Sequence, residues 1–115
     1  MVKEVNESEL KEIIKNNPLV LVDYFTTWCG PCKIQHRILE ELEKIVNAVI
    51  VSIDIDKNEK VAVELGIQAI PTLQFFKNGE LFKFKKDDKY IDRFVGIRNL
   101  EILENIIKKI ENVET

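Results

Sequence analysis

The two cysteines are the residues of this chain with the clearest chemical potential. Cys29 and Cys32 lie within the stretch Trp28-Cys29-Gly30-Pro31-Cys32-Lys33, separated by two residues. Thiols at this spacing can carry redox chemistry, supply half of a metal site, form a structural clip or pack in a core. A zinc site needs four ligands. The chain has no second cysteine pair and a single histidine, His36, so we expect no metal.

The residues around this pair predict its position in the fold. Residues 19–25 form an apolar run of strand length that one carboxylate, Asp23, interrupts. Beyond Cys32, apolar residues recur at helical spacing from Ile34 to Val46. Cys29 should therefore lie at a helix N-terminus, where unpaired N–H groups and the helix dipole stabilise a thiolate and lower the thiol pKa. Cys32 follows one turn later, which favours Cys29 as the attacking nucleophile and Cys32 as the resolving thiol.

Two neighbours of the pair support this interpretation. Pro31 suits the first turn of a helix, where its missing N–H has no intrahelical partner to lose. Asp23 is a lone carboxylate in an apolar strand, and burial of its ionised form is costly, so its pKa should rise toward neutrality. That would suit a general base for Cys32. The alternative is an aspartate that only hydrogen-bonds the end of a strand.

The remaining pattern predicts an α/β domain. The first half of the chain should form an edge strand (2–5), a helix (8–16, capped by Asn6 or Ser8), the strand 19–25, the helix after Cys32 and a strand (48–55). The second half should form a helix (61–65, capped by Asn58), a strand (71–76) and a turn at Asn78-Gly79. A strand that ends near Phe94 or Val95 and a last helix capped by Asn99 complete the expected elements. Strand, helix, strand implies a right-handed parallel crossover, and the turn at Asn78-Gly79 implies an antiparallel hairpin. The result is a central mixed β-sheet with helices on both faces.

Composition narrows the classes of function. The length of 115 residues suits one domain, and the net charge of -3 lacks the basic footprint of a nucleic-acid-binding protein. The N-terminal residues are too polar for a signal peptide, and no segment has the apolar length of a membrane span. We therefore expect a cytoplasmic protein without membrane contact. In a reducing cytosol, a CxxC beside a βαβ pattern favours redox chemistry over a structural disulfide.

These residues resemble the thioredoxin family. Trp28-Cys29-Gly30-Pro31-Cys32-Lys33 is similar to the family's active-site sequence, and residues 22–33 resemble its whole strand-plus-motif segment. Ile70-Pro71-Thr72 resembles the segment that carries the family's cis-proline. Residues 71–80 resemble the hairpin that follows, and residues 93–96 the glycine-containing segment before the last helix. The resemblance covers nearly the whole chain and implies a single domain of thioredoxin fold over residues 1–115.

The resemblance also implies a site. Cys29 and Cys32 would be the redox-active pair, and Asp23 the buried carboxylate that exchanges a proton with the second thiol. The residues implied in active-site support and a substrate groove are Trp28, Gly30, Pro31, Lys33, Ile70, Pro71, Val95, Gly96 and Ile97. With Pro71 in cis, Ile70 would offer its backbone N–H and C=O to an extended substrate. An ordinary trans-proline, and a tryptophan that merely packs on the surface, are the alternatives.

The implied activity is protein-disulfide reduction by dithiol–disulfide exchange. The substrates would be disulfide-containing proteins, and an external reductase such as a thioredoxin reductase would recycle a monomeric protein without a cofactor. One alternative is an oxidase or isomerase of the same fold, which a reduction potential distinguishes. The other is a binding module that docks partners without turnover.

The sequence departs from the family at several positions. Ser52 replaces a lysine that many members place near the buried aspartate, Arg37 replaces a proline, and Phe25 replaces a tryptophan. Residues 82–90 form an insertion in which Phe82 and Phe84 alternate with lysines, and Asp87-Asp88 offers a turn. We expect this insertion to lengthen the hairpin at the sheet edge. Its lysines would discourage edge-to-edge pairing, or the extension would dock a partner.

Overall fold

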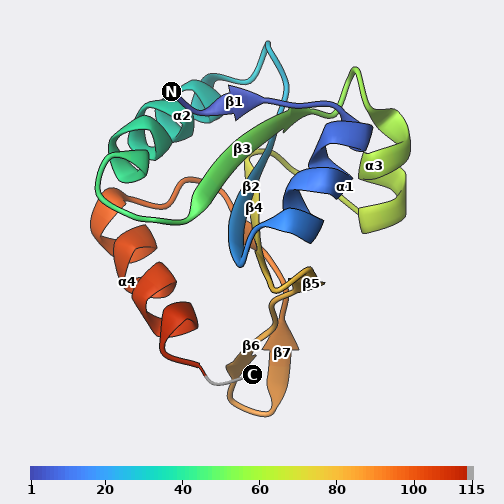
Figure 1. The fold of residues 1–115 in the computed structure, drawn as a ribbon. Coiled ribbons are helices and arrows are strands. Elements are labelled where there is room, and N and C mark those ends of the chain that lie inside the picture. The colour runs from blue at the N-terminus through green and yellow to red at the C-terminus, as the bar shows by residue number, and fades with distance from the viewer. Residues whose placement is uncertain (114–115) are drawn as a thin grey trace.

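The computed structural model describes residues 1–113 and shows a mixed sheet between two helical layers (Figure 1). The strands are β1 (Lys3–Glu4), β2 (Leu19–Phe25), β3 (Val49–Asp54), β4 (Thr72–Lys77), β5 (Glu80–Leu81), β6 (Phe84–Lys86), β7 (Lys89–Ile91) and β8 (Phe94–Val95). The helices are α1 (Glu7–Asn16), α2 (Gly30–Glu43), α3 (Glu59–Leu65) and α4 (Leu100–Glu111). In the described residues, no helix has both the length and the apolar character that a membrane crossing requires.

The main sheet has the order β1-β3-β2-β4-β5, with β8 also paired to β4. β2 runs parallel to β3 and antiparallel to β4, so the sheet is mixed. The parallel pair is joined through α2, which confirms that the connection is a parallel crossover through a helix. β2 lies between two neighbours and under helices on both faces, which explains why its sequence is an almost unbroken apolar run.

The two faces of β2 contact different helices. Leu19 and Leu21 belong to a core cluster with side chains of α2 and α4, whereas Val20 and Val22 pack with side chains of α1 and α3. Figure 1 shows α2 and α4 on one side of the sheet and α1 and α3 on the other. Because strand side chains alternate between faces, Asp23 lies on the same face as Leu21, beneath α2.

Asparagine caps begin the first and last helices: Asn99 caps α4 as predicted, and of the two candidates for α1 the cap is Asn6, not Ser8. Asn6 Oδ1 accepts the backbone N–H of Glu9 at 2.9 Å, and the Glu9 carboxylate accepts the N–H of Asn6 at 3.0 Å, forming a capping box. Asn99 Oδ1 accepts the N–H of Ile102 at 2.9 Å. Asn58 precedes α3 as expected but makes no side-chain capping bond. Its side chain instead donates to the carbonyl of Asp54 at 2.9 Å and accepts the N–H of Glu7 at 3.2 Å.

Two boundary residues differ from the sequence pattern. α2 ends at Glu43, so Ile45 and Val46 lie beyond the helix although they continue its apolar spacing. Val46 still packs against the core, and Ile45 is about half exposed, at 51%. Apolar spacing thus marked Val46 correctly as a core position but did not mark the end of the helix.

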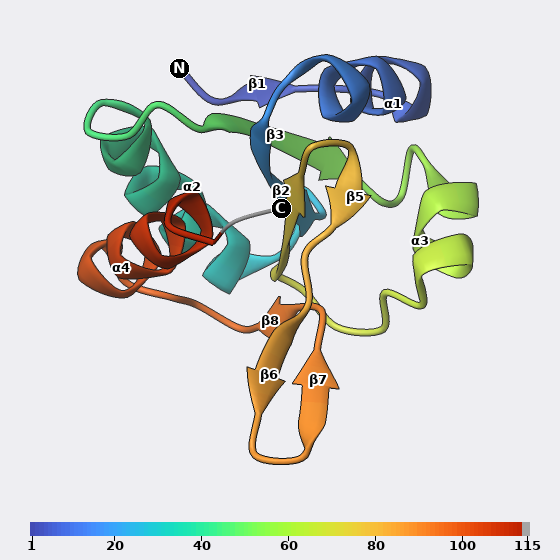
Figure 2. The same cartoon turned by 60° about the horizontal axis from the view of Figure 1, so that its bottom comes forward.

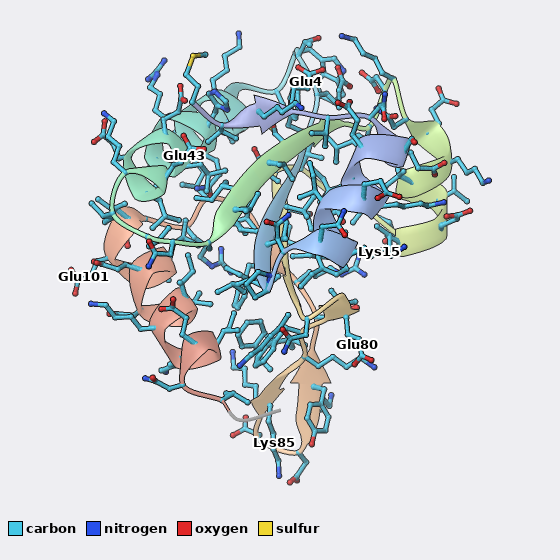
Figure 3. All side chains as sticks on the ribbon, in the orientation of Figure 1. Glu4, Lys15, Glu43, Glu80, Lys85 and Glu101 are labelled. Atoms are coloured by element: carbon cyan, nitrogen blue, oxygen red, sulfur yellow. A yellow bond between two sulfur atoms is a disulfide. The ribbon has the colours of Figure 1, made fainter. Side chains whose placement is uncertain are left out.

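The insertion does not lengthen the hairpin at the sheet edge, so that expectation was wrong. β5 and β8 pair with opposite ends of β4, and the chain between them leaves the sheet to form β6 and β7, which within residues 1–113 pair only with each other. Figure 2 shows this second hairpin projecting away from the main sheet, and Figure 3 places Lys85 on it, far from Glu4 on β1. The predicted turn lies at its tip, where Asp87 adopts φ 57°.

An aromatic cluster explains the direction of the second hairpin. The Phe84 ring lies 5.9 Å from the ring of Phe75 on β4, 4.8 Å from that of Phe82 and 5.1 Å from that of Phe94. All three contacts are edge-to-face, a geometry that aromatic pairs prefer. Phe84 therefore packs inward against the base of the sheet, while Lys83 and Lys85, which alternate with the phenylalanines, are exposed.

Candidate functional site

The cysteine pair lies where β2 leads into α2. Cys29 is the N-cap residue of α2, and its Sγ accepts the backbone N–H of Cys32 at 3.1 Å. The two residues form a disulfide, with their Cα atoms 5.3 Å apart. Pro31 lies in the first helical turn, as expected. Among the described residues, none beyond its chain neighbours and its own helix lies within 4 Å of a Cβ placed at Gly30, so packing does not require glycine there.

Asp23 lies behind the disulfide, on the face of β2 that α2 covers. The residue is 1% exposed, and its Oδ1 has no hydrogen-bond partner in the described part of the chain. Burial raises the pKa of Asp23 to about 7, which confirms the predicted direction. Its partner in the β2–β3 register is Ser52, so the neighbouring strand brings a small neutral side chain next to it.

Trp28 is an exposed residue that is held by a specific hydrogen bond. The indole is 72% exposed, and its Nε1 donates a hydrogen bond to Asp56 Oδ2 at 2.8 Å. The backbone N–H of Asp56 in turn donates to Asp54 Oδ1 at 2.9 Å. The segment that follows β3 thus restrains the position of the Trp28 indole. The role of Asp56 was not predicted from the sequence. The one feature that could have indicated it is its position just after a parallel strand, at the same end of the sheet as Cys29.

Two further segments of the expected site lie together. The Ile70–Pro71 peptide bond is cis, as the family resemblance implied. The N–H of Gly96 donates to the carbonyl of Pro71 at 2.8 Å, and β8 pairs Val95 with Thr72. Gly96 has φ 89°, a conformation that favours glycine. Val95 and Ile97 are 50% and 39% exposed, so apolar side chains flank this junction at the surface.

Gln35 connects these segments to α2, and it was not predicted from the sequence. The residue is fully buried, and its Nε2 donates to the carbonyl of Arg98 at 3.1 Å. Its Oε1 accepts the backbone N–H of Arg98 at 2.7 Å. The sequence could have indicated this role, because Gln35 is a polar residue on the buried stripe of α2 that includes Cys32 and Leu39. Because this pair of hydrogen bonds holds the loop after β8 against α2, it fixes Gly96 and Ile97 relative to the cysteines.

The residues predicted for the site lie in two groups in the structure, one around the cysteine pair and one at the cis-proline. Cys29, Cys32 and Asp23 share one end of the sheet beneath α2, and the cis-proline segment is joined to the Gly96 segment. Lys33 lies on α2 with an exposed side chain. Cys32, Lys33 and Asp23 also line a common cavity of about 860 Å³.

Comparison with known proteins agrees with this geometry. The Thioredoxin family matches residues 1–109. A thioredoxin of Chlamydia caviae is 36% identical over 110 residues, covering 95% of this chain and 98% of its own. The structure of a mutant thioredoxin from Halobacterium salinarum superposes with a TM-score of 0.83 at 27% identity, covering 98% of this chain and 93% of that one.

A third comparison concerns a chain from a yeast structure. That structure addresses the thiol-resolving mechanism of a mitochondrial 1-Cys peroxiredoxin via glutathione and thioredoxin systems. The TM-score is 0.73 at 27% identity, and each chain is covered to 94%. The family match and the paired cysteines support dithiol–disulfide reductase activity on protein disulfides. The chain therefore belongs to the thioredoxin family and is a protein-disulfide oxidoreductase.

Proposed function

We propose that Cys29 is the attacking thiol of a protein-disulfide reductase. The observation that carries this assignment is the hydrogen bond from the Cys32 N–H to Cys29 Sγ at the start of α2. In the reduced protein, this N–H and the positive end of the helix dipole stabilise a thiolate on Cys29. The thiolate attacks a substrate disulfide and forms a mixed disulfide, and one substrate sulfur leaves as a thiolate.

Cys32 then resolves the mixed disulfide. Its thiolate attacks Cys29 Sγ, restores the internal disulfide and releases the second substrate sulfur. Asp23 is the proposed base for Cys32. Its burial beneath α2 and its pKa of about 7 support this role, because a base titrating near neutral pH can accept the thiol proton and later return it.

The substrate segment would bind along Ile70, Pro71 and the Val95–Ile97 segment. The exposed apolar side chains of Val95 and Ile97 support contact with a substrate, and Ile70 would supply backbone pairing to an extended chain. Trp28, Gly30, Pro31 and Lys33 would form the other side of the contact surface. Such main-chain recognition suits disulfide-bonded proteins of many sequences.

Partners and compartment follow from the same chemistry. Disulfide-bonded proteins are the substrates, and a reductase of the thioredoxin reductase kind would return the protein to its dithiol form. A thiol-dependent peroxidase is one candidate substrate class, because the yeast neighbour was studied with a peroxiredoxin. We propose that the protein is a monomer, because the edge strands β1 and β5 have only two residues each and offer little for pairing with another chain. We also propose a cytoplasmic location, because a dithiol reductase remains reduced there.

Single-cysteine variants test these roles. Cys32→Ser should accumulate a mixed disulfide between Cys29 and insulin, and Cys29→Ser should form none; both should lose insulin reduction with dithiothreitol as the electron source. A Cys29→Ser variant that retains turnover would contradict the assignment. The reduction potential of the couple should lie near or below about -230 mV, and a value of about -180 mV or higher would favour the oxidase or isomerase alternative.

A further inference from the structure

The segment that leads from β8 to α4 carries one wall of the proposed substrate groove. Val95 and Ile97 are exposed on this segment, and the N–H of Gly96 donates to the carbonyl of Pro71 at 2.8 Å. Figure 2 shows the segment crossing from β8 to α4, on the side of the sheet that α2 covers. Residues 96–99 belong to no helix or strand, so their position depends on side chains that bond to their backbone.

Gln35 of α2 supplies the first of these contacts. It lies one turn after Cys32 and is fully buried. Its amide pairs with both backbone groups of Arg98, donating to the carbonyl at 3.1 Å and accepting the N–H at 2.7 Å. Within residues 1–113, no other partner bonds either of these groups. Because a backbone group without a partner is costly where water is excluded, this pairing ties the segment to the helix that carries the cysteines.

The side chain of Arg98 supplies the second contact. Its Nη1 donates to the carbonyls of Val95 at 3.0 Å and Ile97 at 3.4 Å, so the segment curls around the guanidinium. The Cζ atom of Arg98 lies 5.5 Å from the centroid of the Phe94 ring, a cation–π contact. The Phe94 ring packs in turn against Phe84 of the second hairpin, at 5.1 Å. One arginine thus binds two carbonyls of the wall and rests on the aromatic cluster that includes the insertion.

We propose that Gln35 and Arg98 are positioning residues for protein substrates, which hold the wall at residues 95–97 at a fixed place relative to Cys29. This inference rests on the disulfide-reductase function proposed above. Among the described residues, neither side chain bonds a cysteine, so the thiol chemistry does not depend on them. A polypeptide substrate contacts Cys29 and the wall together, whereas a small disulfide contacts only the cysteine. Loss of the two contacts should therefore separate these two classes of substrate.

Reaction rates with a protein disulfide and a small disulfide test the proposal. The reduced protein is mixed in a stopped-flow instrument with insulin or with dipyridyl disulfide, and the fluorescence of its single tryptophan reports oxidation. Gln35→Met keeps the length of the buried side chain but removes both hydrogen bonds to Arg98. It should slow insulin reduction roughly tenfold, because a displaced wall orients the substrate poorly. The rate with dipyridyl disulfide and the reduction potential of the cysteine pair should stay unchanged.

Gln74→Met is the matched control. Gln74 is also a fully buried glutamine, and its Oε1 accepts the hydroxyl of Tyr24 at 2.7 Å. In the described part of the chain it makes no side-chain hydrogen bond to residues 94–98. The control therefore makes the same substitution and leaves a buried group without its partner, but it does not release the wall. It should keep both rates of the parent protein.

Arg98→Met tests the same wall at a half-buried position, where it should fold even if Gln35→Met does not. It removes the guanidinium contacts and should slow insulin reduction by about threefold, with the rate for dipyridyl disulfide unchanged. Equal losses with both disulfides, unchanged insulin rates in the folded variants, or an equal effect of Gln74→Met would overturn the proposal. A parent protein that does not reduce insulin would overturn the proposed function as well, whereas an active parent with unaffected variants would overturn this inference alone.

Discussion

Replacement of Asp23 by asparagine should stabilise the protein, by an amount that depends on pH. Asparagine has nearly the shape of a protonated carboxyl group but cannot ionise. The folded protein holds the Asp23 carboxyl in a buried position without an opposing charge, so ionisation there opposes folding. The substitution removes this penalty and leaves the packing against α2 unchanged.

The sign and size of the effect follow from linkage. The pKa of Asp23 is raised from 3.8 to about 7 on folding. Below the lower value both states hold the proton, and Asp23 imposes no penalty. Between the two values the unfolded chain releases its proton while the folded protein keeps it, so stability falls as pH rises. Above about pH 7 the penalty is complete, and at about 1.4 kcal/mol per pKa unit it reaches about 4 kcal/mol.

Chemical denaturation of the oxidised protein between about pH 4 and pH 8.5 measures this penalty. The difference in unfolding free energy between Asp23→Asn and the parent should be near zero at about pH 4 and rise to about 4 kcal/mol at about pH 8.5. Asp88→Asn makes the same chemical change at the exposed hairpin tip and should stay within about 0.5 kcal/mol throughout. A difference for Asp23→Asn that does not change with pH, or a destabilised variant at high pH, would refute the reasoning.

Three further substitutions test other contacts. Gly96→Ala should lower the unfolding free energy by about 1–2 kcal/mol in denaturant titrations, because alanine must adopt a positive φ; an unchanged midpoint would count against this. Phe84→Ala should lower it by about 2 kcal/mol through loss of the aromatic cluster, and a neutral result would mean that the hairpin packs independently. Asp56→Ala should lower the fluorescence anisotropy of Trp28 by releasing its indole, whereas an unchanged value would show that other contacts restrain it.

The elements that position the cysteines could be predicted because local and global signals agree there. The apolar run of β2 has its single charged residue, Asp23, on the face that α2 covers, and Pro31 suits the helix start next to Cys29. Periodicity and capping chemistry encode these features within a few neighbouring residues. The same agreement holds for Asn6, where the capping box lies within four residues of sequence.

What could not be predicted depends on contacts between distant segments. Asn58 makes no cap because its side chain is shared between Asp54 and Glu7, which are far apart in sequence. The role of Gln35 depends on its two hydrogen bonds to the backbone of Arg98, which is distant in sequence. The direction of the second hairpin depends on packing between phenylalanine rings of several strands. The alternation of phenylalanine and lysine therefore predicted strands correctly but did not predict their position relative to the main sheet.

The second hairpin also bears on how this chain can change over evolution. Because β6 and β7 pair only with each other in the part of the chain that the structure describes, residues can be added or removed at the tip without shifting the register of β4 against its neighbours. The base stays anchored through Phe84, which lies before the tip in the sequence. The tip is therefore a position where length and sequence can vary with little effect on the fold, and where a foreign peptide could be displayed.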